Sequence, residues 1–237
     1  MTTPVKTLKK AARKQLDKLI AIFLPKRLNQ RVSSSNGLWN HYFTLAEDAI
    51  DHQWDTMIWP VIKDFDFDTV LELAPGAGRN TEKLAQLAGT IHAVDLNEYA
   101  IEQTRQRFQN YTGDCKLYFH TNDGSDLGMI KDNTITCVYC WDSAVHFDKE
   151  IIRDYVKEFA RVLKAGGMGF IHHSNLGASA NGDIRKNPHW RSNMSKELFE
   201  EYCKENALEL VSQTDLPWGK ITDCISVFQK ARPSVTN

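Results

Sequence analysis

The sequence of 237 residues has no apolar run that approaches the length needed to span a bilayer. The longest run near its start, residues 19–24, is shorter than the core of a signal peptide, and no small-residue cleavage site follows it. Both absences argue against a membrane-spanning or secreted protein. We therefore expect a cytoplasmic protein whose hydrophobic content, 42%, is enough for one sizeable α/β domain.

Cysteine is scarce and does not form a framework. The five cysteines are odd in number and scattered along the chain. Cys137 and Cys140 form a C-x-x-C string, but they lie in a strand-like apolar run, where residues three apart point to opposite faces. No second Cys or His pair at zinc spacing completes a site. The sequence predicts buried, reduced thiols.

Positive charge is not in surplus, because the formal net charge is −1. A nucleic-acid partner is therefore not expected. Residues 1–37 are an exception, since their first 31 positions carry nine Lys or Arg against the single acid Asp17, with apolar residues at helical spacing. This basic amphipathic segment could lie on an anionic membrane or dock on an acidic partner. The alternatives are a helix that packs on the acidic remainder of the chain or one that is frayed in solution.

Residues 38–237 form the main predicted domain. An aromatic-rich helical segment, residues 38–67, includes Trp39 and Trp54 and is expected to act as a lid or to pack in the core. From Asp68 onward, apolar strand-like runs alternate with helical patterns, which indicates a doubly wound, mostly parallel sheet with helices on both faces. A long polar loop at residues 174–194 interrupts this rhythm and is predicted to serve the substrate. Two further strands close the chain.

The clearest motif is VLELAPGAGRNTEKLA, residues 70–85. A strand that carries Glu72 is followed by Gly76 and Gly78, which let the backbone approach a ligand, and then by a helix. The next strand ends in Asp95, which is placed to accept hydrogen bonds from ribose hydroxyls. A dinucleotide site would need a third glycine, and Glu72 would repel a pyrophosphate. An acid suits an ammonium group, so the predicted ligand joins an amino acid to adenosine, as S-adenosyl-L-methionine does.

In these motifs the chain resembles the class I, Rossmann-like S-adenosylmethionine-dependent methyltransferases, from about Asp68 to Lys230. ELAPGAG is similar to their first motif, with Ala74 where glycine is commonest. AVDLN, NDGSDL, CVYCWDSAVHF and RVLKAGGMGFI are similar to later motifs, in the right order and spacing. The resemblance implies a seven-stranded sheet whose last strand is antiparallel.

The resemblance also implies roles for individual residues. Glu72 would orient the methionine amino group, Asp95 would hold the ribose, and Asp123 would accept from the adenine amino group. The complete set implied for the cofactor is Glu72, Ala74, Gly76, Gly78, Arg79, Asn80, Asp95, Leu96, Asp123, Gly124, Cys140 and Trp141.

Methyl transfer to a hydroxyl needs a base, and histidine has a suitable pKa. Histidines follow the fourth and fifth strands at the sheet edge where a doubly wound fold binds ligands. We predict His146 as the base and His173 as the next candidate, with Asp142 orienting one of them or binding substrate. Neighbours on a strand point to opposite faces, so only one of His172 and His173 should face the cleft. His172, Trp190 and Arg191 are the predicted substrate residues.

The leading functional hypothesis is methyl transfer to an oxygen of a small molecule or of a sugar or glycan. The alternatives are an N-methyltransferase acting on an amine and a non-catalytic protein that binds S-adenosylmethionine. No residues have the fixed spacing of a metal site, so no metal is assigned, although Asp142 and a histidine could contribute to a magnesium site.

Overall fold

The computed structural model describes residues 50–232. The predicted basic helix and linker of residues 1–37 and its proposed membrane contact lie outside the described residues. So does the first part of the aromatic segment, residues 38–49, which includes Trp39. Among residues 50–232, no helix has both the length and the apolar character needed to cross a membrane.

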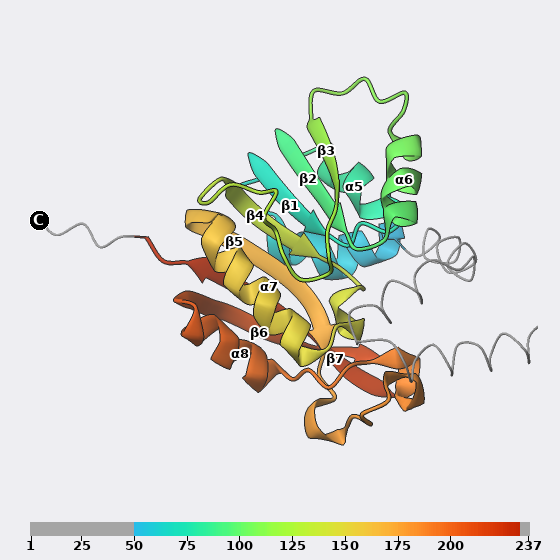
Figure 1. The fold of residues 1–237 in the computed structure, drawn as a ribbon, viewed down its shortest axis with the longest axis vertical. Helices are drawn as coiled ribbons and strands as arrows, with labels where there is room; N and C mark the ends of the chain where they lie inside the picture. Colours follow the sequence, from blue (N-terminus) through green and yellow to red (C-terminus); the bar gives the residue numbers. More distant parts are fainter. Residues whose placement is uncertain (1–49, 233–237) are drawn as a thin grey trace, which may run out of the picture.

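A seven-stranded sheet forms the centre of the molecule (Figure 1). Its order is β3-β2-β1-β4-β5-β7-β6. The strands are β1 (Thr69–Leu73), β2 (Thr90–Asp95), β3 (Lys116–Thr121), β4 (Ile135–Cys140), β5 (Leu163–Ser174), β6 (Leu208–Trp218) and β7 (Ile221–Lys230). The first five pair in parallel, whereas β7 is antiparallel to both β5 and β6. The predicted fold class is confirmed.

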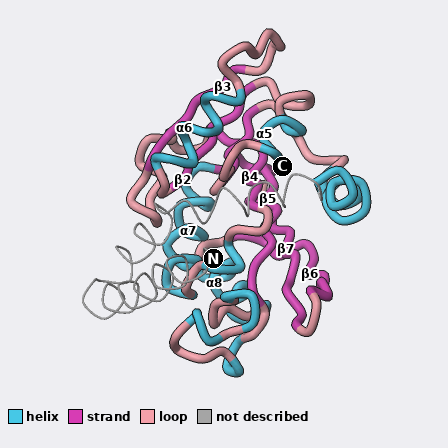
Figure 2. Tube along the Cα trace, turned by 90° about the vertical axis from the view of Figure 1, so that its right-hand side faces the viewer, coloured by secondary structure: helices cyan, strands magenta, loops and turns pink. Residues whose placement is uncertain are grey.

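Helices cover both faces of the sheet (Figure 2). One face carries η1 (Trp54–Ile58), α4 (Trp59–Ile62), α5 (Arg79–Leu84) and α6 (Glu98–Arg107), and the other carries α7 (Lys149–Val162) and α8 (Lys196–Glu205). Polar caps set where helices begin: the Asn97 side chain accepts from the Tyr99 amide at 3.0 Å, and Ser195 accepts from the Leu198 amide at 3.2 Å.

The aromatic segment belongs to the core within the described residues. Trp54 is buried, and its ring lies 6.4 Å from those of Trp59 and Tyr139. Core packing, the alternative considered for these aromatics, therefore accounts for Trp54.

The five cysteines are buried and free, as predicted. Cys137 packs in the hydrophobic cluster on the α5 side of the sheet and Cys140 in the cluster on the α7 side. Their thiols therefore point to opposite faces, which rules out a shared metal ion.

Short turns complete the edge formed by the carboxyl ends of the parallel strands. A single turn, η2 (Ala144–His146), follows β4. The long loop after β5 contains η3 (Gly177–Ser179), η4 (Ile184–Lys186) and η5 (Pro188–Trp190). The loop returns over η2, where the Ser192 amide donates to the Val145 carbonyl at 2.9 Å.

Candidate active site

The turn between β1 and α5 is shaped by left-handed backbone. Ala74, Gly76 and Gly78 have φ angles of 58°, 62° and 83°. A Cβ added to Gly78 would lie 2.9 Å from Thr104 Cγ2, so this position requires glycine on both conformational and steric grounds. The Thr104 hydroxyl donates to the Gly76 carbonyl at 2.9 Å and fastens the turn to α6. The result is a fixed turn whose backbone a ligand can approach closely.

Glu72 lies beneath this turn with 1% of its surface exposed. Burial raises the pKa of its carboxyl to about 7, against the hydrogen bond from the Thr81 hydroxyl at 2.6 Å to Oε2. Oε1 is buried and has no hydrogen-bond partner among the described residues. A buried carboxylate oxygen without a donor is unfavourable, and the ammonium group of an amino acid would supply one.

Asp95 ends the neighbouring strand, β2. Its carboxyl is half-buried, and Oδ1 accepts from the Asn97 amide at 2.8 Å. Burial raises its pKa to about 6. Leu96 follows it directly and is also half-buried. The position after the second strand of a doubly wound sheet is where a ribose is held.

The end of β3 adds Asp123 and Gly124. The Asn122 amide donates to the Asp95 carbonyl at 3.1 Å, which joins this strand end to that of β2. Asp123 Oδ1 accepts from the amides of Ser125 and Asp126 at 2.9 and 3.2 Å. Gly124 is buried at a φ of 100°. These contacts place Asp123 beside the predicted nucleoside position.

The end of β4 forms the other wall. Trp141 is 2% exposed, its ring lies 4.6 Å from that of His172, and its indole N–H donates to Gln53 Oε1 at 3.1 Å. Asp142 has a φ of 54°, and its Oδ2 lies 3.4 Å from an Arg79 nitrogen. This ion pair joins the first turn to the wall.

Two of the predicted cofactor residues take other positions. The Asn80 side chain is buried, and its Oδ1 accepts from the Tyr139 hydroxyl at 3.0 Å, so packing beneath the turn fits it better than contact with the methionine carboxylate. The Cys140 thiol packs under α7 rather than along the cleft. Burial raises its pKa to about 12, so it stays a neutral thiol.

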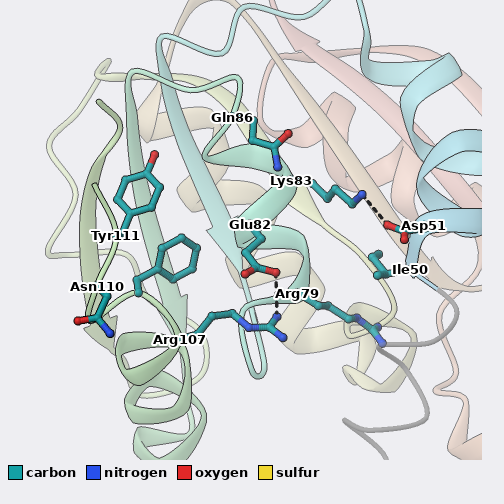
Figure 3. A pocket seen from close by; sticks show the side chains of 10 residues that line it. Ile50, Asp51, Arg79, Glu82, Lys83, Gln86, Arg107, Asn110 and Tyr111 are labelled. Carbon is teal, nitrogen blue, oxygen red and sulfur yellow. Dashed lines mark ion pairs between the residues drawn. The ribbon is translucent and has the colours of Figure 1, made fainter. Parts of the chain in front are cut away.

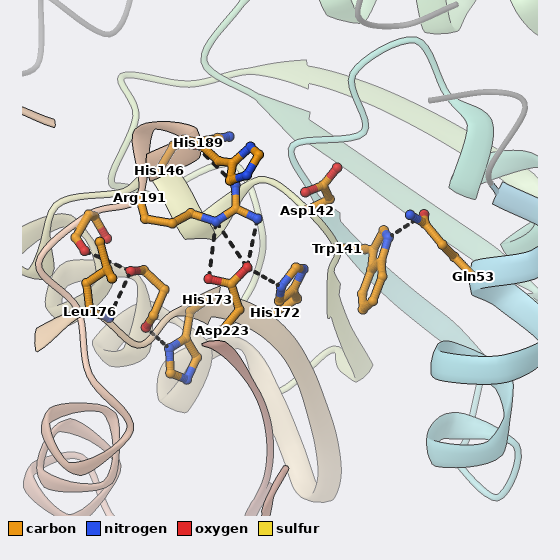
Figure 4. A network of polar contacts seen from close by, with 12 residues as sticks. Gln53, Trp141, Asp142, His146, His172, His173, Leu176, His189, Arg191 and Asp223 are labelled. Carbon is orange, nitrogen blue, oxygen red and sulfur yellow. Dashed lines mark hydrogen bonds and ion pairs between the residues drawn. The ribbon is translucent and has the colours of Figure 1, made fainter. Parts of the chain in front are cut away.

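The acceptor side is a network of charged and aromatic residues (Figure 4). Asp223 of β7 is fully buried, and its carboxylate accepts from Arg191 at 2.7 Å and from His172 Nε2 at 3.2 Å. The His172 ring lies 5.5 Å from that of Trp218, and the Arg191 guanidinium lies 5.4 Å from the same ring. Arg191 and His172, two of the predicted substrate residues, are thus both buried partners of Asp223.

His146 lies at the end of η2, close to this network. Its Nδ1 is 3.0 Å from the Trp190 carbonyl oxygen, which can only accept, so Nδ1 carries a hydrogen and donates it. Burial lowers the pKa of His146; the hydrogen bond to Trp190 opposes this, and the positive charge of Arg191 adds to it. His146 is therefore neutral near pH 7 and has its lone pair on Nε2.

His173 does not reach the cleft, which corrects its prediction as a second candidate base. Its ring stacks on Phe199 at 4.9 Å on the α8 side of the sheet. Its Nδ1 donates to the Ser174 carbonyl at 2.8 Å, and its Nε2 accepts from the Ser226 hydroxyl at 2.8 Å. Both ring nitrogens are in use in the core. Burial lowers its pKa to about 4.

Trp190 also differs from its prediction. Its side chain is 51% exposed, and its carbonyl, rather than its indole, contacts the site through His146. Asp223, Trp218 and Gln53 were not predicted. Asp223 could have been found as a charged residue inside the apolar strand pattern of residues 221–230. Its pairing with Arg191 could not, because the two residues are 32 positions apart in the sequence.

A cavity of about 610 Å³ lies behind the first turn, between α5, the end of α6 and residues 50–51 (Figure 3). Its charges are engaged within the wall: Lys83 pairs with Asp51 at 2.5 Å and Arg107 with Glu82 at 3.7 Å. It shares Arg79 with the site but does not contain His146 or Asp223. Within residues 50–232, no group of three or more His, Cys, Asp or Glu side chains could hold a metal ion.

Comparison with known proteins agrees with this geometry. Residues 70–167 match the family model described as a methyltransferase domain. The solved structures similar to this fold include an S-adenosylmethionine-dependent methyltransferase from Clostridium acetobutylicum, with a TM-score of 0.62 and 17% identity over 82% of this chain and all of that one. Geranyl diphosphate C-methyltransferase from Streptomyces coelicolor gives 0.56 and 14%, over 69% of this chain and 71% of that one.

The fold is that of S-adenosylmethionine-dependent methyltransferases, and solved structures that share it were determined with S-adenosyl-L-homocysteine or S-adenosylmethionine bound. Phosphoethanolamine N-methyltransferase 1 from Zea mays is 26% identical over 143 residues, 60% of this chain and 28% of that protein. Its counterpart from Triticum aestivum is 25% identical over 193 residues, 77% of this chain and 36% of that protein. The chain therefore spans about a third of the length of the curated relatives it matches.

The chain's own residues fit the cofactor. Glu72 Oε1 is buried without a donor among the described residues, and Asp95 carries a carboxylate at the end of the neighbouring strand β2. If the chain binds S-adenosylmethionine, Glu72 would hold its ammonium group, Asp95 its ribose and the Asp123 turn its adenine, as the sequence predicts.

Proposed function

We propose that the chain transfers a methyl group to a hydroxyl oxygen of a small molecule or sugar, with His146 as the base. The observation that supports this most directly is the hydrogen bond from His146 Nδ1 to the Trp190 carbonyl, together with the lowered pKa of this ring. The bond leaves Nε2 able to accept a proton, and the lowered pKa keeps the ring neutral near pH 7.

The chemistry is an in-line displacement. Bound S-adenosylmethionine supplies a methyl group on a positively charged sulfur. As the methyl group moved from sulfur to the acceptor oxygen, His146 Nε2 would take the hydroxyl proton. The negative charges of Asp142 and Asp223 favour the imidazolium that results. The main contribution of the site is alignment, because the attacking oxygen, the methyl carbon and the leaving sulfur must lie on one line.

Asp142 is held in an ion pair and is not the base of this proposal. It pairs with Arg79 at 3.4 Å, and Ser143, the next residue, donates from its hydroxyl to the Ala74 carbonyl at 3.3 Å. These contacts hold the end of β4 against the cofactor turn. We propose that Asp142 orients the acceptor and stabilises charged His146.

A small-molecule acceptor is supported by the aromatic cluster of Trp141, His172 and Trp218 beside the Arg191–Asp223 pair. Aromatic faces suit the apolar faces of sugar rings as well as flat metabolites. Among the structural neighbours, geranyl diphosphate C-methyltransferase was solved with its small-molecule substrate. Peripheral membrane contact through residues 1–37 remains a proposal based on their charge.

N-methylation of an amine is the second candidate. The curated relatives carry the name phosphoethanolamine N-methyltransferase. An amine that arrives uncharged needs less help from a base, so His146 would matter less for it. A third candidate is a non-catalytic protein that binds the cofactor, which would release no S-adenosylhomocysteine with any acceptor.

The test measures S-adenosylhomocysteine release from S-adenosylmethionine with a panel of sugars and phenols and, as the amine, phosphoethanolamine. We expect turnover with a hydroxyl acceptor and a loss of about 10²- to 10⁴-fold in kcat for His146→Gln. His52→Gln, at an exposed position on the N-terminal helical segment, is the matched control. Turnover with phosphoethanolamine alone, unchanged in His146→Gln, would replace this proposal with the second candidate.

A further inference from the structure

Two neighbouring residues of the long loop have a backbone conformation that side chains disfavour. His189 and Trp190 have φ angles of 49° and 57°. Neither is glycine, and residues other than glycine keep such a conformation only where the surrounding structure holds them in it. Since strain of this kind gathers where a chain must present a particular group, the contacts that hold these two residues indicate what the loop is for.

A buried ion pair next to the strained residues provides the anchor. Arg191 is 3% exposed and Asp223 is fully buried. Arg191 Nε lies 3.1 and 3.0 Å from the two Asp223 oxygens, and a second guanidinium nitrogen lies 2.7 Å from Oδ2. The remaining guanidinium nitrogen donates to the His189 carbonyl at 3.3 Å. The pair thus fixes both the Arg191 side chain and the backbone two residues before it.

The residues on each side of Arg191 bind the turn that carries His146. On one side the Ser192 amide donates to the Val145 carbonyl at 2.9 Å, and on the other the Trp190 carbonyl accepts from His146 Nδ1 at 3.0 Å. Figure 4 shows Arg191 reaching from this strip of loop toward Asp223, with His146 next to it. The ion pair therefore holds the part of the loop that presents the Trp190 carbonyl to His146.

We propose that Arg191 and Asp223 are positioning residues for His146: their buried ion pair holds the Trp190 carbonyl against Nδ1 and so keeps the imidazole lone pair on Nε2. Without a partner at Nδ1, a neutral imidazole exchanges its hydrogen between both nitrogens, and part of the population would lose the lone pair at Nε2. This inference gives a mechanism for the base of the proposed function and rests on it only for the catalytic use of Nε2.

The charges that face His146 give the anchor a second measurable effect. Arg191 of the loop disfavours protonation of His146, whereas Asp142 after β4 and Asp223 of β7 favour it. Removing Arg191 and Asp223 together removes one charge that lowers the pKa of His146 and one that raises it. A change in the position of the hydrogen can therefore be separated from a change in the affinity for protons.

The test is ¹⁵N NMR of histidine-labelled full-length protein saturated with S-adenosylhomocysteine. The signals of His146 are assigned by their loss in His146→Gln. In the wild type we expect Nδ1 to give an N–H type signal and Nε2 a pyridine type signal near pH 7.5. In the double variant Arg191→Met with Asp223→Leu, we expect both signals to move toward averaged values, because the carbonyl is no longer held.

The double variant is preferred because removing one partner alone leaves a buried charge, which is strongly destabilising. The matched control replaces the exposed pair of the same loop, Arg185→Met with Asp183→Leu, whose nitrogen and oxygen lie 2.8 Å apart. This control should keep the wild-type signals. Trp190→Gly relieves the left-handed strain and leaves the ion pair intact, so it provides a second, folded variant and should also keep the Nδ1 hydrogen.

An N–H type signal at Nε2 in the wild type, or unchanged signals in the folded double variant, would overturn the inference. Both outcomes are independent of turnover, because no acceptor is present. If the signals behave as expected and no hydroxyl acceptor is methylated, the proposed function fails while the positioning role stands.

Discussion

His172 and His173 are adjacent in sequence, but β5 turns their rings to opposite faces of the sheet. The His172 ring lies 4.6 Å from that of Trp141 on the cleft side, and the His173 ring lies 4.9 Å from that of Phe199 on the α8 side. Both are fully buried. This relationship places His172 beside Trp141 and His173 in the core under α8, where its charge state affects stability.

His173 should make the protein less stable in acid. Its pKa is about 4 in the folded state, below the ordinary value of 6.5, so between these values the unfolded chain binds more protons. Stability from the buried neutral ring is present above pH 6.5 and is lost as the pH falls toward 4, by up to about 3 kcal/mol. Urea unfolding of His173→Gln should show a shallower loss between pH 7 and 5 than the wild type.

His92 also has a pKa of about 4 and lowers stability in acid in the same way. The dependence of unfolding free energy on pH should therefore become weaker in His173→Gln but should not disappear. His52→Gln serves as the exposed control. If His173→Gln keeps the wild-type slope, His173 is not buried as the neutral ring.

Glu72 should show the opposite dependence. Its folded pKa of about 7 lies above the ordinary value of 4.5, so the folded state holds more protons between these values. Stability is therefore lost as the pH rises through this window, by up to about 3 kcal/mol above pH 7. Glu72→Gln should raise the urea midpoint of the cofactor-free protein at pH 8 and leave it nearly unchanged at pH 4.5.

The same variant should bind S-adenosylmethionine more weakly, because an amide cannot neutralise the ammonium group. Glu209→Gln, at an exposed position on β6, controls for loss of an acid. A midpoint at pH 8 that does not rise in Glu72→Gln would contradict the burial penalty.

Asp95 should control affinity for the nucleoside. We expect Asp95→Ala to weaken both S-adenosylmethionine and S-adenosylhomocysteine by about 10- to 100-fold in calorimetry, the size of a lost hydrogen bond to a charged group. Since its folded pKa is about 6, wild-type binding should strengthen as the pH rises through 6. Asp64→Ala, at an exposed position, should bind like the wild type. No binding by the wild type would falsify the cofactor assignment.

Gly78 should tolerate no side chain. Gly78→Ala combines a φ of 83° with a contact of 2.9 Å to Thr104, so we expect a loss of about 1–3 kcal/mol in stability and weaker cofactor binding. Gly182→Ala is the matched control, since its added Cβ meets nothing within 4 Å. Thermal unfolding and calorimetry of both variants decide the matter; equal results for the two would remove the special role of Gly78.

The fold was predictable because its signals are local. Alternating apolar runs and helical periods marked β1 to β5 and their helices, and the glycines after Glu72 marked a turn with left-handed backbone. The positions of Asp95 and Asp123 followed from the same order, since Asp95 ends β2 and Asp123 follows the end of β3, its parallel neighbour. The sequence alone determined the class of fold and the edge of the sheet at which the predicted cofactor residues gather.

The tertiary structure alone decided which histidine faces the cleft and what holds it. Alternation required His172 and His173 to differ, but only the pairing of β5 with β7 and the packing of α8 select the face for each. Likewise, Arg191 and Asp223 meet because the long loop folds back over η2, across 32 positions of sequence. Their burial makes the contact strong, and no local pattern of residues records it, since the partners become neighbours only after the sheet has formed.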